Sequence, residues 1–357
     1  MGLTPSEQAA TQTNPIEPTV IVFETSPDGS LDAIVQHDER TVYLYLNGRD
    51  GNFGTRACWV RNLIAAPMEI SQSDLRQGIP PALPRFVINH PNGLPAPTAN
   101  DLSVVWFEEG NGIALFEKNS LLAVIPPWSG REAFHGYARD CLHENEVCWP
   151  MPHQPALAER IRRAAEFWKS WKSGNPLAHL KDDLLPKYRT RFGPDAQTYE
   201  VGGDQWPPLL IYRFDNDAGS RLLTLGMSLR PQPNVELSNE LPVVLRRIEL
   251  GLEYRLGTFF ESVDQAIELL AGQARYPWRK WTWLGHGHIA KLTRVDQPTV
   301  NLLFVSERNF RVELTRFRDD PVHLLWAVPI SESEIPHADT NLSAFIDHCQ
   351  NAGRLTN

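Results

Sequence analysis

The sequence predicts an α+β protein of two lobes, each built on a mostly antiparallel or mixed β-sheet with packed helices. The chain has 357 residues, which is long for one hydrophobic core, because single cores stop growing at about 250–300 residues. Short β-rich stretches fill the chain before residue 155, and strands and late helices follow without strict alternation. That order is typical of an α+β fold and not of a doubly wound parallel sheet.

The first part of the chain predicts a mainly β lobe over residues 19–155. Residues 1–18 are polar and contain several prolines and threonines, which predicts a flexible tail. Residues 76–97 are rich in proline and predict an irregular connection. Stretches rich in β-branched and aromatic residues, bounded by Asp-Gly, Asn-Gly and Gly-Asn turns, predict strands. These stretches are 19–23, 41–46, 57–63, 104–107 and 121–125.

A helix and a linker over residues 156–204 are predicted to bridge the two lobes. Helical spacing over 157–172 places apolar side chains on one face, between a starting Pro155 and a stopping Gly174. The opposite face is basic, and we expect its charges to be solvated. The apolar residues are Leu157, Ile161, Ala164, Trp168 and Trp171, and the basic ones are Arg160, Arg162, Arg163, Lys169 and Lys172. Residues 173–207 are predicted to be a turn-rich connection.

Residues 205–357 predict an α+β domain. Helices are expected over 262–275, which opens with a Ser262/Gln265 capping box, and over 341–353. The alternation after Arg246 puts Ile248, Leu250 and Leu252 on one side of a strand. Arg247 and Glu249 lie on the other side, which we expect to be wet. The predicted strands are 209–214, 222–226, 243–254, 299–305, 310–317 and 322–330.

Charge and cysteine content limit the function classes. The net charge of -9 argues against a general nucleic-acid binder, which carries a basic surface. The cysteines are few and mostly far apart, which favours a reducing compartment; they are Cys58, Cys141, Cys148 and Cys349. No apolar run approaches the roughly 18 residues of a membrane span. We therefore expect a cytoplasmic protein that binds neither nucleic acid nor a membrane.

Known catalytic and cofactor motifs are missing from the sequence. Neither a phosphate-binding glycine loop nor a nucleophile elbow occurs, and we expect no cofactor. Ser129, His135 and Asp140 lie close in sequence, but a triad requires its members to converge in space. Glu108 and Glu109 precede a Gly-Asn-Gly turn and are expected to be solvated.

The segment around Cys141 is the strongest candidate for a metal site. Cys141, His143 and Cys148 are typical zinc ligands by residue type, with His135 and His153 on either side. The Cys141-x-His143 spacing is too tight for a common zinc site, so buried cysteines and surface histidines explain the segment better. Whether these residues ever bind metal stays open at this point.

His286 and His288 alternate with glycines in the sequence LGHGHI. Their spacing would place both side chains on one face of a strand. A pair of histidines without a nearby acidic ligand is a poor metal site, whereas the glycines allow a partner backbone to approach closely. We favour a packing or partner-binding role for this pair.

The stretch LLTLGMSLRP at residues 222–231 breaks the rule that a buried strand avoids glycine. With LLTLGMSLRPQ (222–232), RRIELGLEYR (246–255), the helix and aromatic segment 266–289 and HLLWAVPISESEI (323–335), it forms an ordered series. In order and spacing this series resembles the suppressor of fused (SUFU) domain family, its bacterial branch in particular, over about residues 205–350. On that reading, Gly226 bends the end of a core strand and Met227 packs beneath the turn.

The resemblance implies binding without catalysis. Animal members of this family clamp an extended peptide of a transcription factor between two lobes, and many bacterial members resemble immunity proteins that neutralise a toxin. We therefore expect a non-catalytic interaction protein that holds another protein, such as a toxin domain, at a cleft between its lobes. The alternative is a hydrolase or metal-dependent enzyme whose site lies at residues 126–153. The oligomeric state is not predictable from the sequence.

The predicted partner site lies in the aromatic segment of the second lobe. Tryptophan is enriched at interface hot spots, and the glycines beside the histidines permit close approach. The residues assigned to this site are Trp278, Trp283, His286 and His288. Trp281 lies in the same run, and the alternative for these tryptophans, Trp281 and Trp283 above all, is that they belong to the core.

Overall fold

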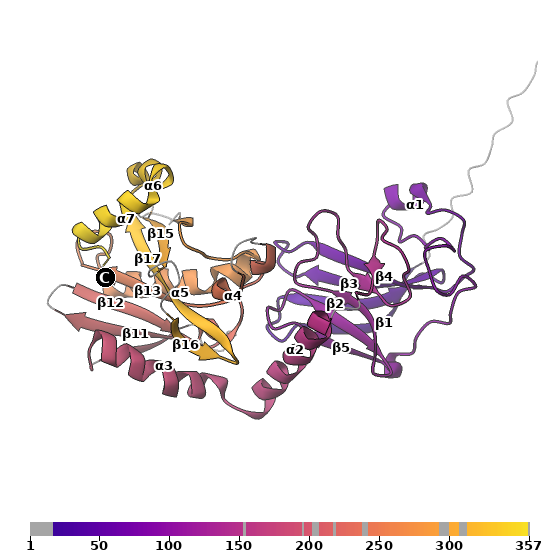
Figure 1. Ribbon diagram of the computed structural model, residues 1–357, viewed down its shortest axis with the longest axis horizontal. Coiled ribbons are helices and arrows are strands. Elements are labelled where there is room, and N and C mark those ends of the chain that lie inside the picture. Colours follow the sequence, from indigo (N-terminus) through magenta and orange to yellow (C-terminus); the bar gives the residue numbers. More distant parts are fainter. Residues whose placement is uncertain are drawn as a thin grey trace, which may run out of the picture.

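The computed structural model describes residues 17–152, 155–194, 196–201, 207–216, 219–237, 242–292, 300–306 and 313–355. The tail predicted over 1–18 thus lies almost wholly outside the described residues. The fold is α+β, as predicted, with a 4-stranded, a 5-stranded and an 8-stranded sheet. Figure 1 shows the first two sheets on one side of the molecule and the 8-stranded sheet on the other, with helix α2 between them.

The N-terminal lobe is built from the two smaller sheets. The 4-stranded antiparallel sheet consists of β1 (Thr19–Thr25), β2 (Leu31–His37), β3 (Thr41–Gly48) and β4 (Thr55–Asn62). The 5-stranded sheet consists of β5 (Leu102–Trp106), β6 (Ile113–Glu117), β7 (Ser120–Ile125), β8 (Tyr137–Ala138) and β9 (Trp149–Pro150). A short helix, α1 (Gln72–Arg76), and a 3-10 turn, η1 (Ala99–Asp101), lie on either side of the proline-rich connection between the two sheets.

Helix α2 (Pro155–Ser173) covers one side of this lobe with the apolar face that the sequence predicts. Leu157 and Ile161 pack with Phe107, Ala114 and Val124 in a small core of their own. The indole of Trp168 donates to the Trp106 carbonyl at 2.8 Å. The helix is therefore fixed to the N-terminal lobe through β5 and the residues that follow it.

The prediction of a turn-rich connection over 173–207 is wrong. Residues Pro176–Phe192 form helix α3, and Gln197–Val201 form strand β10. Asn175 caps the helix by accepting the Ala178 N–H at 3.1 Å, and Pro176 occupies its first turn, where a missing N–H has no cost. Pro186 lies inside α3 and makes the segment look broken in sequence.

The 8-stranded sheet forms the centre of the second lobe. Its order is β10-β11-β12-β13-β17-β15-β14, and β16 also pairs with β17. β13 and β17 are parallel, and the other pairs are antiparallel. The further strands are β11 (Leu209–Asn216), β12 (Gly219–Leu225), β13 (Arg247–Tyr254), β14 (Ile289–Leu292), β15 (Val300–Ser306), β16 (Glu313–Phe317) and β17 (Asp320–Ile330).

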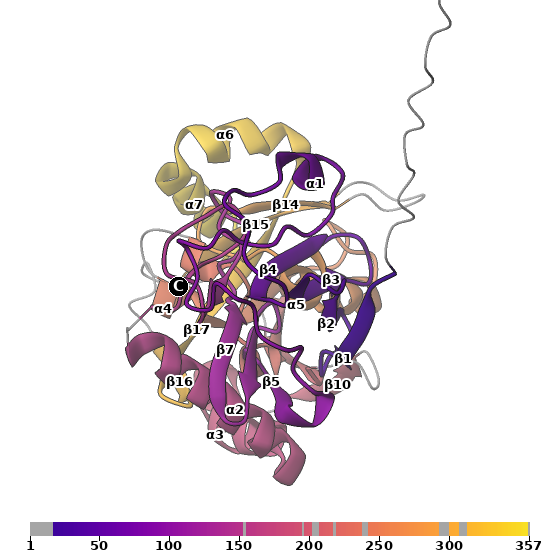
Figure 2. The same cartoon turned by 90° about the vertical axis from the view of Figure 1, so that its right-hand side faces the viewer.

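Both faces of this sheet are covered. Helix α5 (Val263–Lys280) packs on one face, against Ile248, Leu250 and Leu252 of β13. Helix α3 packs on the other face, together with α6 (Ile335–Thr340) and α7 (Leu342–Asn351). Figures 1 and 2 show α6 and α7 at one end of the lobe and α3 at the opposite end.

The prediction that one side of β13 faces solvent is therefore wrong. All eight residues of β13, Arg247 and Glu249 included, are buried, because this strand lies inside a sheet with helices on both faces. The predicted start of this strand is also wrong. Residues Pro242–Leu245 form a short helix, α4, after the 3-10 turn η3 (Val235–Leu237), and the strand begins at Arg247.

Candidate functional site

The aromatic segment of the predicted partner site begins inside helix α5, which runs five residues beyond the predicted end. Trp278 lies in its last turn, buried, and donates from Nε1 to the Pro231 carbonyl at 3.0 Å. Trp281 follows in a left-handed conformation and is also buried, as expected for a core residue. Its ring packs edge-on against Phe53 of the N-terminal lobe, with ring centres 5.0 Å apart.

Trp283, His286 and His288 follow, and their side chains are half-buried. The rings of Trp283 and His288 lie 4.2 Å apart between centres. Gly285 makes this arrangement possible, because a Cβ at that position would overlap the Trp283 ring. These residues therefore form a compact aromatic unit between α5 and β14.

The two histidines do not lie on a strand, contrary to the prediction. They occupy a turn around Gly287, whose φ is +84°, and β14 begins at Ile289. His286 accepts the Ser306 N–H through Nδ1 at 3.1 Å. Partial burial lowers the pKa of both imidazoles, and a backbone hydrogen bond to Trp283 opposes this shift at His288. Both rings are therefore neutral at pH 7.

Gly226 bends the end of β12, as the sequence predicts. Its φ is +123°, and a Cβ there would overlap the Pro208 carbonyl oxygen. Met227, Ser228 and Leu229 then form the 3-10 turn η2, with Met227 buried beneath it. The turn aims two N–H groups at Glu249, whose Oε1 accepts from Gly226 and Ser228 at 3.0 Å each.

The junction of the two lobes is filled with paired charges. We call this group the junction cluster. It comprises Asp28, Glu108, Glu109, Arg160, Arg163, Arg230, Glu236, Arg246, Arg247, Arg318 and Asp320. Its members come from the β1–β2 and β5–β6 connections, helix α2, the segments on either side of α4, and the turn that joins β16 to β17. The cluster therefore joins elements of both lobes.

Glu108 and Glu109 are the centre of the junction cluster, so the prediction that they are solvated is wrong. Their exposures are 2% and 0%. Arg247 donates to Glu108 Oε2, and Arg160 reaches Glu109 Oε1 at 2.7 Å. Arg246 lies 3.1 Å from Glu109. Burial of these carboxylates is possible because each has arginine partners.

Arg230, which ends the LLTLGMSLR stretch, makes a second link between the lobes. It is buried, lies 2.7 Å from Asp28 Oδ2, and donates to the Glu109 carbonyl at 2.8 Å. Gly110 leaves room for its guanidinium, because a Cβ there would overlap Nη2. The bend at Gly226 therefore directs the chain toward the N-terminal lobe.

Arginines control the ionisation of two acids in the cluster, Asp28 and Glu109. Burial alone would raise the pKa of Asp28, but Arg230 and the Ser26 and Ser30 hydroxyls outweigh it and bring the pKa to about 2. Burial opposes Arg160 and Arg246 at Glu109 in the same way, and the arginines lower its pKa. The carboxylates are therefore charged at pH 7.

The basic face of α2 is only partly solvated, which corrects the prediction. Arg162 is exposed, with Glu159 and Glu166 beside it. Arg160 bridges Glu109 and Glu236, whereas Arg163 lies 3.2 Å from Asp320. Two of the predicted surface arginines thus belong to the lobe junction.

The region of the alternative enzyme site does not assemble a triad. His135 hydrogen-bonds the backbone of Ala57, whereas the Asp140 carboxylate accepts from Arg139 Nε at 3.1 Å and lies 3.8 Å from His90 Nε2. Ser129 is buried. Among the hydrogen bonds of the described residues, none joins Ser129, His135 and Asp140 to one another.

Cys141 and Cys148 lie beside each other in the N-terminal core. Cys141 donates to the His143 carbonyl at 3.1 Å, and Asn145 donates from Nδ2 to the two sulfurs at 3.4 and 3.7 Å. The His143 residue is exposed. Within the described ranges, no three His, Cys, Asp or Glu residues are grouped so that they could hold a metal ion. His153 lies outside the described residues.

Sequence reasoning missed the junction cluster because each charge has its partner far along the chain. Glu108 and Arg247 are separated by 139 residues, and Asp28 and Arg230 by 202. The one local signal was Arg246-Arg247 at the start of a strand whose alternate residues are Ile248, Leu250 and Leu252, since buried strands rarely accept unpaired arginine.

Among the helices that the structure describes, none has both the length and the apolar character required to cross a membrane. A comparison with curated proteins gave no match. A comparison with solved structures matched a chain of "the Sufu-Fu complex crystal structure" at 16% identity and a TM-score of 0.32, covering 46% of this chain and 79% of that one. A likeness at this level establishes neither a common fold nor a common function.

A comparison with family models gave a match to Suppressor of fused protein (SUFU) over residues 205–354. The match confirms the resemblance to the family predicted for about 205–350 but does not distinguish its bacterial branch, and it spans the 8-stranded sheet from β11 onward with α5, α6 and α7. The N-terminal lobe, α2, α3 and β10 lie outside it. Residues 205–354 are thus the part of this chain that matches the SUFU family.

Proposed function

We propose that this chain is a non-catalytic protein-interaction protein of the bacterial SUFU-domain type, and that it neutralises a toxin domain by binding it. The match of residues 205–354 to the SUFU family is the observation that carries this proposal. The net charge of -9 agrees with a basic toxin as the partner, because complementary charge speeds encounter and favours the correct partner.

The proposed contact surface is the segment that leaves α5 at the lobe junction and turns toward β14. Trp283, His286 and His288 are half-buried there, and so present part of their rings to the surface. Trp278, which we also assigned to the site from sequence, is 7% exposed. It would support the surface from below, through its bond to the Pro231 carbonyl.

The first experiment changes both histidines and keeps an acceptor for the Ser306 N–H. We expect the double variant His286→Asn, His288→Ala to retain the wild-type melting temperature within about 2 °C, because an asparagine oxygen can still accept the Ser306 N–H and the lost contacts are near the surface. The matched control is His337→Asn, His348→Ala, which changes two exposed histidines of the same lobe in α6 and α7.

The readout is protection of bacterial cells that co-express a candidate toxin domain chosen from the genes next to this one, together with complex formation by the purified pair. The proposal predicts protection and a complex with the wild type and the control, and loss of both with the test variant. Absence of any complex between the wild type and that toxin domain would contradict the immunity role. Equal binding by all three proteins would move the contact surface elsewhere.

A further inference from the structure

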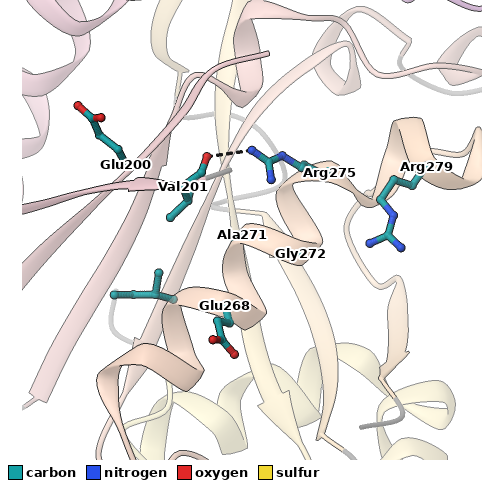
Figure 3. Close-up of a pocket in the computed structure, with 8 residues that line it drawn as sticks. Glu200, Val201, Glu268, Ala271, Gly272, Arg275 and Arg279 are labelled. Atoms are coloured by element: carbon teal, nitrogen blue, oxygen red, sulfur yellow. Dashed lines mark hydrogen bonds between the residues drawn. The ribbon is translucent and has the colours of Figure 1, made fainter. Parts of the chain in front are cut away.

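A pocket of about 550 Å³ lies between β10 and α5. Figure 3 shows Arg275 and Arg279 on neighbouring turns of α5, with Ala271 and Gly272 one turn earlier and Val201 opposite. The volume is in the range of small-molecule sites, which run from about 300 to 1,000 Å³. The pocket belongs to neither the proposed contact surface nor the junction cluster.

Gly272 lacks an explanation within the chain. It lies inside helix α5, where glycine costs about 1 kcal/mol relative to alanine. A Cβ at this position would meet no atom within 4 Å, and its φ does not lie in the left-handed region that favours glycine. Neither close packing nor backbone geometry requires glycine here, and its effect is to leave open space in the wall of the pocket.

Arg275 and Arg279 lie four residues apart on α5 and both line the pocket. Arg275 donates from Nη2 to the Val201 carbonyl at 2.9 Å, and its Nε is buried without a partner. Among the described residues, neither Arg275 nor Arg279 forms an ion pair, although arginines of the junction cluster are each paired with acids. Figure 3 shows the carboxylates of Glu200 and Glu268 lying apart from both guanidinium groups.

We infer that this pocket binds a small molecule that carries an oxyanion, either a carboxylate or a phosphate monoester. The apolar part of this ligand would fill the space that Gly272 leaves open. Guanidinium groups match the geometry of both anions and can bind them through paired N–H donors. The side chains of Val201, Ile267 and Ala271 supply apolar surface beside the charges. This inference is independent of the proposed function.

Calorimetric titration at low salt tests the pocket with four probes: phenyl phosphate, phenylacetate, inorganic phosphate and the neutral phenylacetamide. We expect saturable binding of phenyl phosphate or phenylacetate to the wild type. Either result supports the inference, and it also says which oxyanion the pocket prefers. We expect phenylacetamide and inorganic phosphate to bind at least about tenfold more weakly, because phenylacetamide lacks the negative charge and inorganic phosphate lacks the apolar ring.

Gly272→Phe should fill the pocket and weaken binding of the better probe at least about tenfold, whereas Gly272→Ala should retain most of it. Arg279→Gln, at an exposed position, should weaken the same probe about fivefold or more without unfolding the protein. Failure of both aromatic anions to bind the wild type overturns the inference. Unchanged affinity in both Gly272→Phe and Arg279→Gln, or inorganic phosphate binding as tightly as phenyl phosphate, overturns it as well.

Discussion

Glu249 is a carboxylate at 0% exposure whose partners are all neutral donors. Its Oε1 accepts from the Gly226 and Ser228 N–H groups and from the Ser228 hydroxyl, and its Oε2 accepts from Thr224 at 2.6 Å. Removing the acceptor would leave buried donors unpaired, at about 1–3 kcal/mol each. We expect Glu249→Ala to lower the free energy of unfolding by about 4 kcal/mol or more in urea titrations.

The matched control is Glu268→Ala, at an exposed position of α5, which should change the free energy of unfolding by less than about 0.5 kcal/mol. If both alanine variants were equally stable, Glu249 would not hold the turn.

Burial raises the pKa of Glu249 above its ordinary value of 4.5, because it outweighs the hydrogen bonds from Ser228 and Thr224. A raised pKa in the folded state means that stability from the protonated carboxyl is fully present below pH 4.5 and is lost as pH rises through the folded value. As the pH rises through the folded pKa, the free energy of unfolding of the wild type should therefore fall relative to that of Glu249→Gln. Unfolding curves for both proteins between pH 4 and 8 would show parallel profiles if the pKa were not raised.

At the scale of elements, the bend after β12 depends on glycine for two reasons, backbone conformation and space. Gly226 has φ of +123° and faces the Pro208 carbonyl, whereas Gly257 has φ of +87° with no atom within 4 Å of an added Cβ. Gly257→Ala should cost about 1 kcal/mol from backbone strain alone. Gly226→Ala should cost at least about 2 kcal/mol more, because overlap is added. Equal costs in urea titrations would show that the Pro208 contact does not matter.

Local pattern was sufficient for elements whose sides differ in polarity. The helices α2, α5 and α7 and most strands lie where spacing and turn residues predict them. Local pattern failed where neighbouring elements bury side chains that are polar. The sequence predicts that Arg247 and Glu249 of β13 face solvent, although α3 and its neighbours bury that side of the strand.

The strands β2 and β6 and the helix α3 were missed for a different reason. The strands LDAIVQH and IALFE contain few β-branched or aromatic residues, and the helix PLAHLKDDLLPKYRTRF is interrupted by Pro186. Pairing with neighbouring strands, or packing on the 8-stranded sheet, stabilises them in the fold.

Across the whole molecule, the pair of Asp28 and Arg230 couples the lobes. A fall in the pKa of Asp28 from 3.8 to about 2 corresponds to about 2 kcal/mol of stability at pH 7. Since the folded pKa is lowered, this stability is present above pH 3.8 and is lost as pH falls toward 2. We expect Asp28→Asn to cost about 2 kcal/mol at pH 7 and progressively less below pH 3.8.

Urea titrations of Asp28→Asn at pH 7 and pH 3 test this coupling, with Asp339→Asn on an exposed position of α6 as control. The control should be neutral at both pH values. A cost for Asp28→Asn that is the same at both pH values would show that its role is not electrostatic.

The candidate contact surface was predictable only as a run of aromatic and glycine residues. The sequence places Trp278, Trp283, His286 and His288 close together, but it does not tell which rings are covered. Their burial depends on Pro231, Phe304 and Ser306, which other segments bring to them. Charge pairing at the junction depends even more on distant segments.

The spacing of the junction cluster along the chain has a consequence for synthesis on the ribosome. Glu108 emerges 139 residues before Arg247, and Asp28 emerges 202 residues before Arg230. At about 5–20 residues per second, the first lobe waits on the order of ten seconds or longer for its arginines. During that time the Asp28 and Glu108 carboxylates must remain hydrated on the nascent lobe, so the lobe completes its own burial only when the second lobe has been translated.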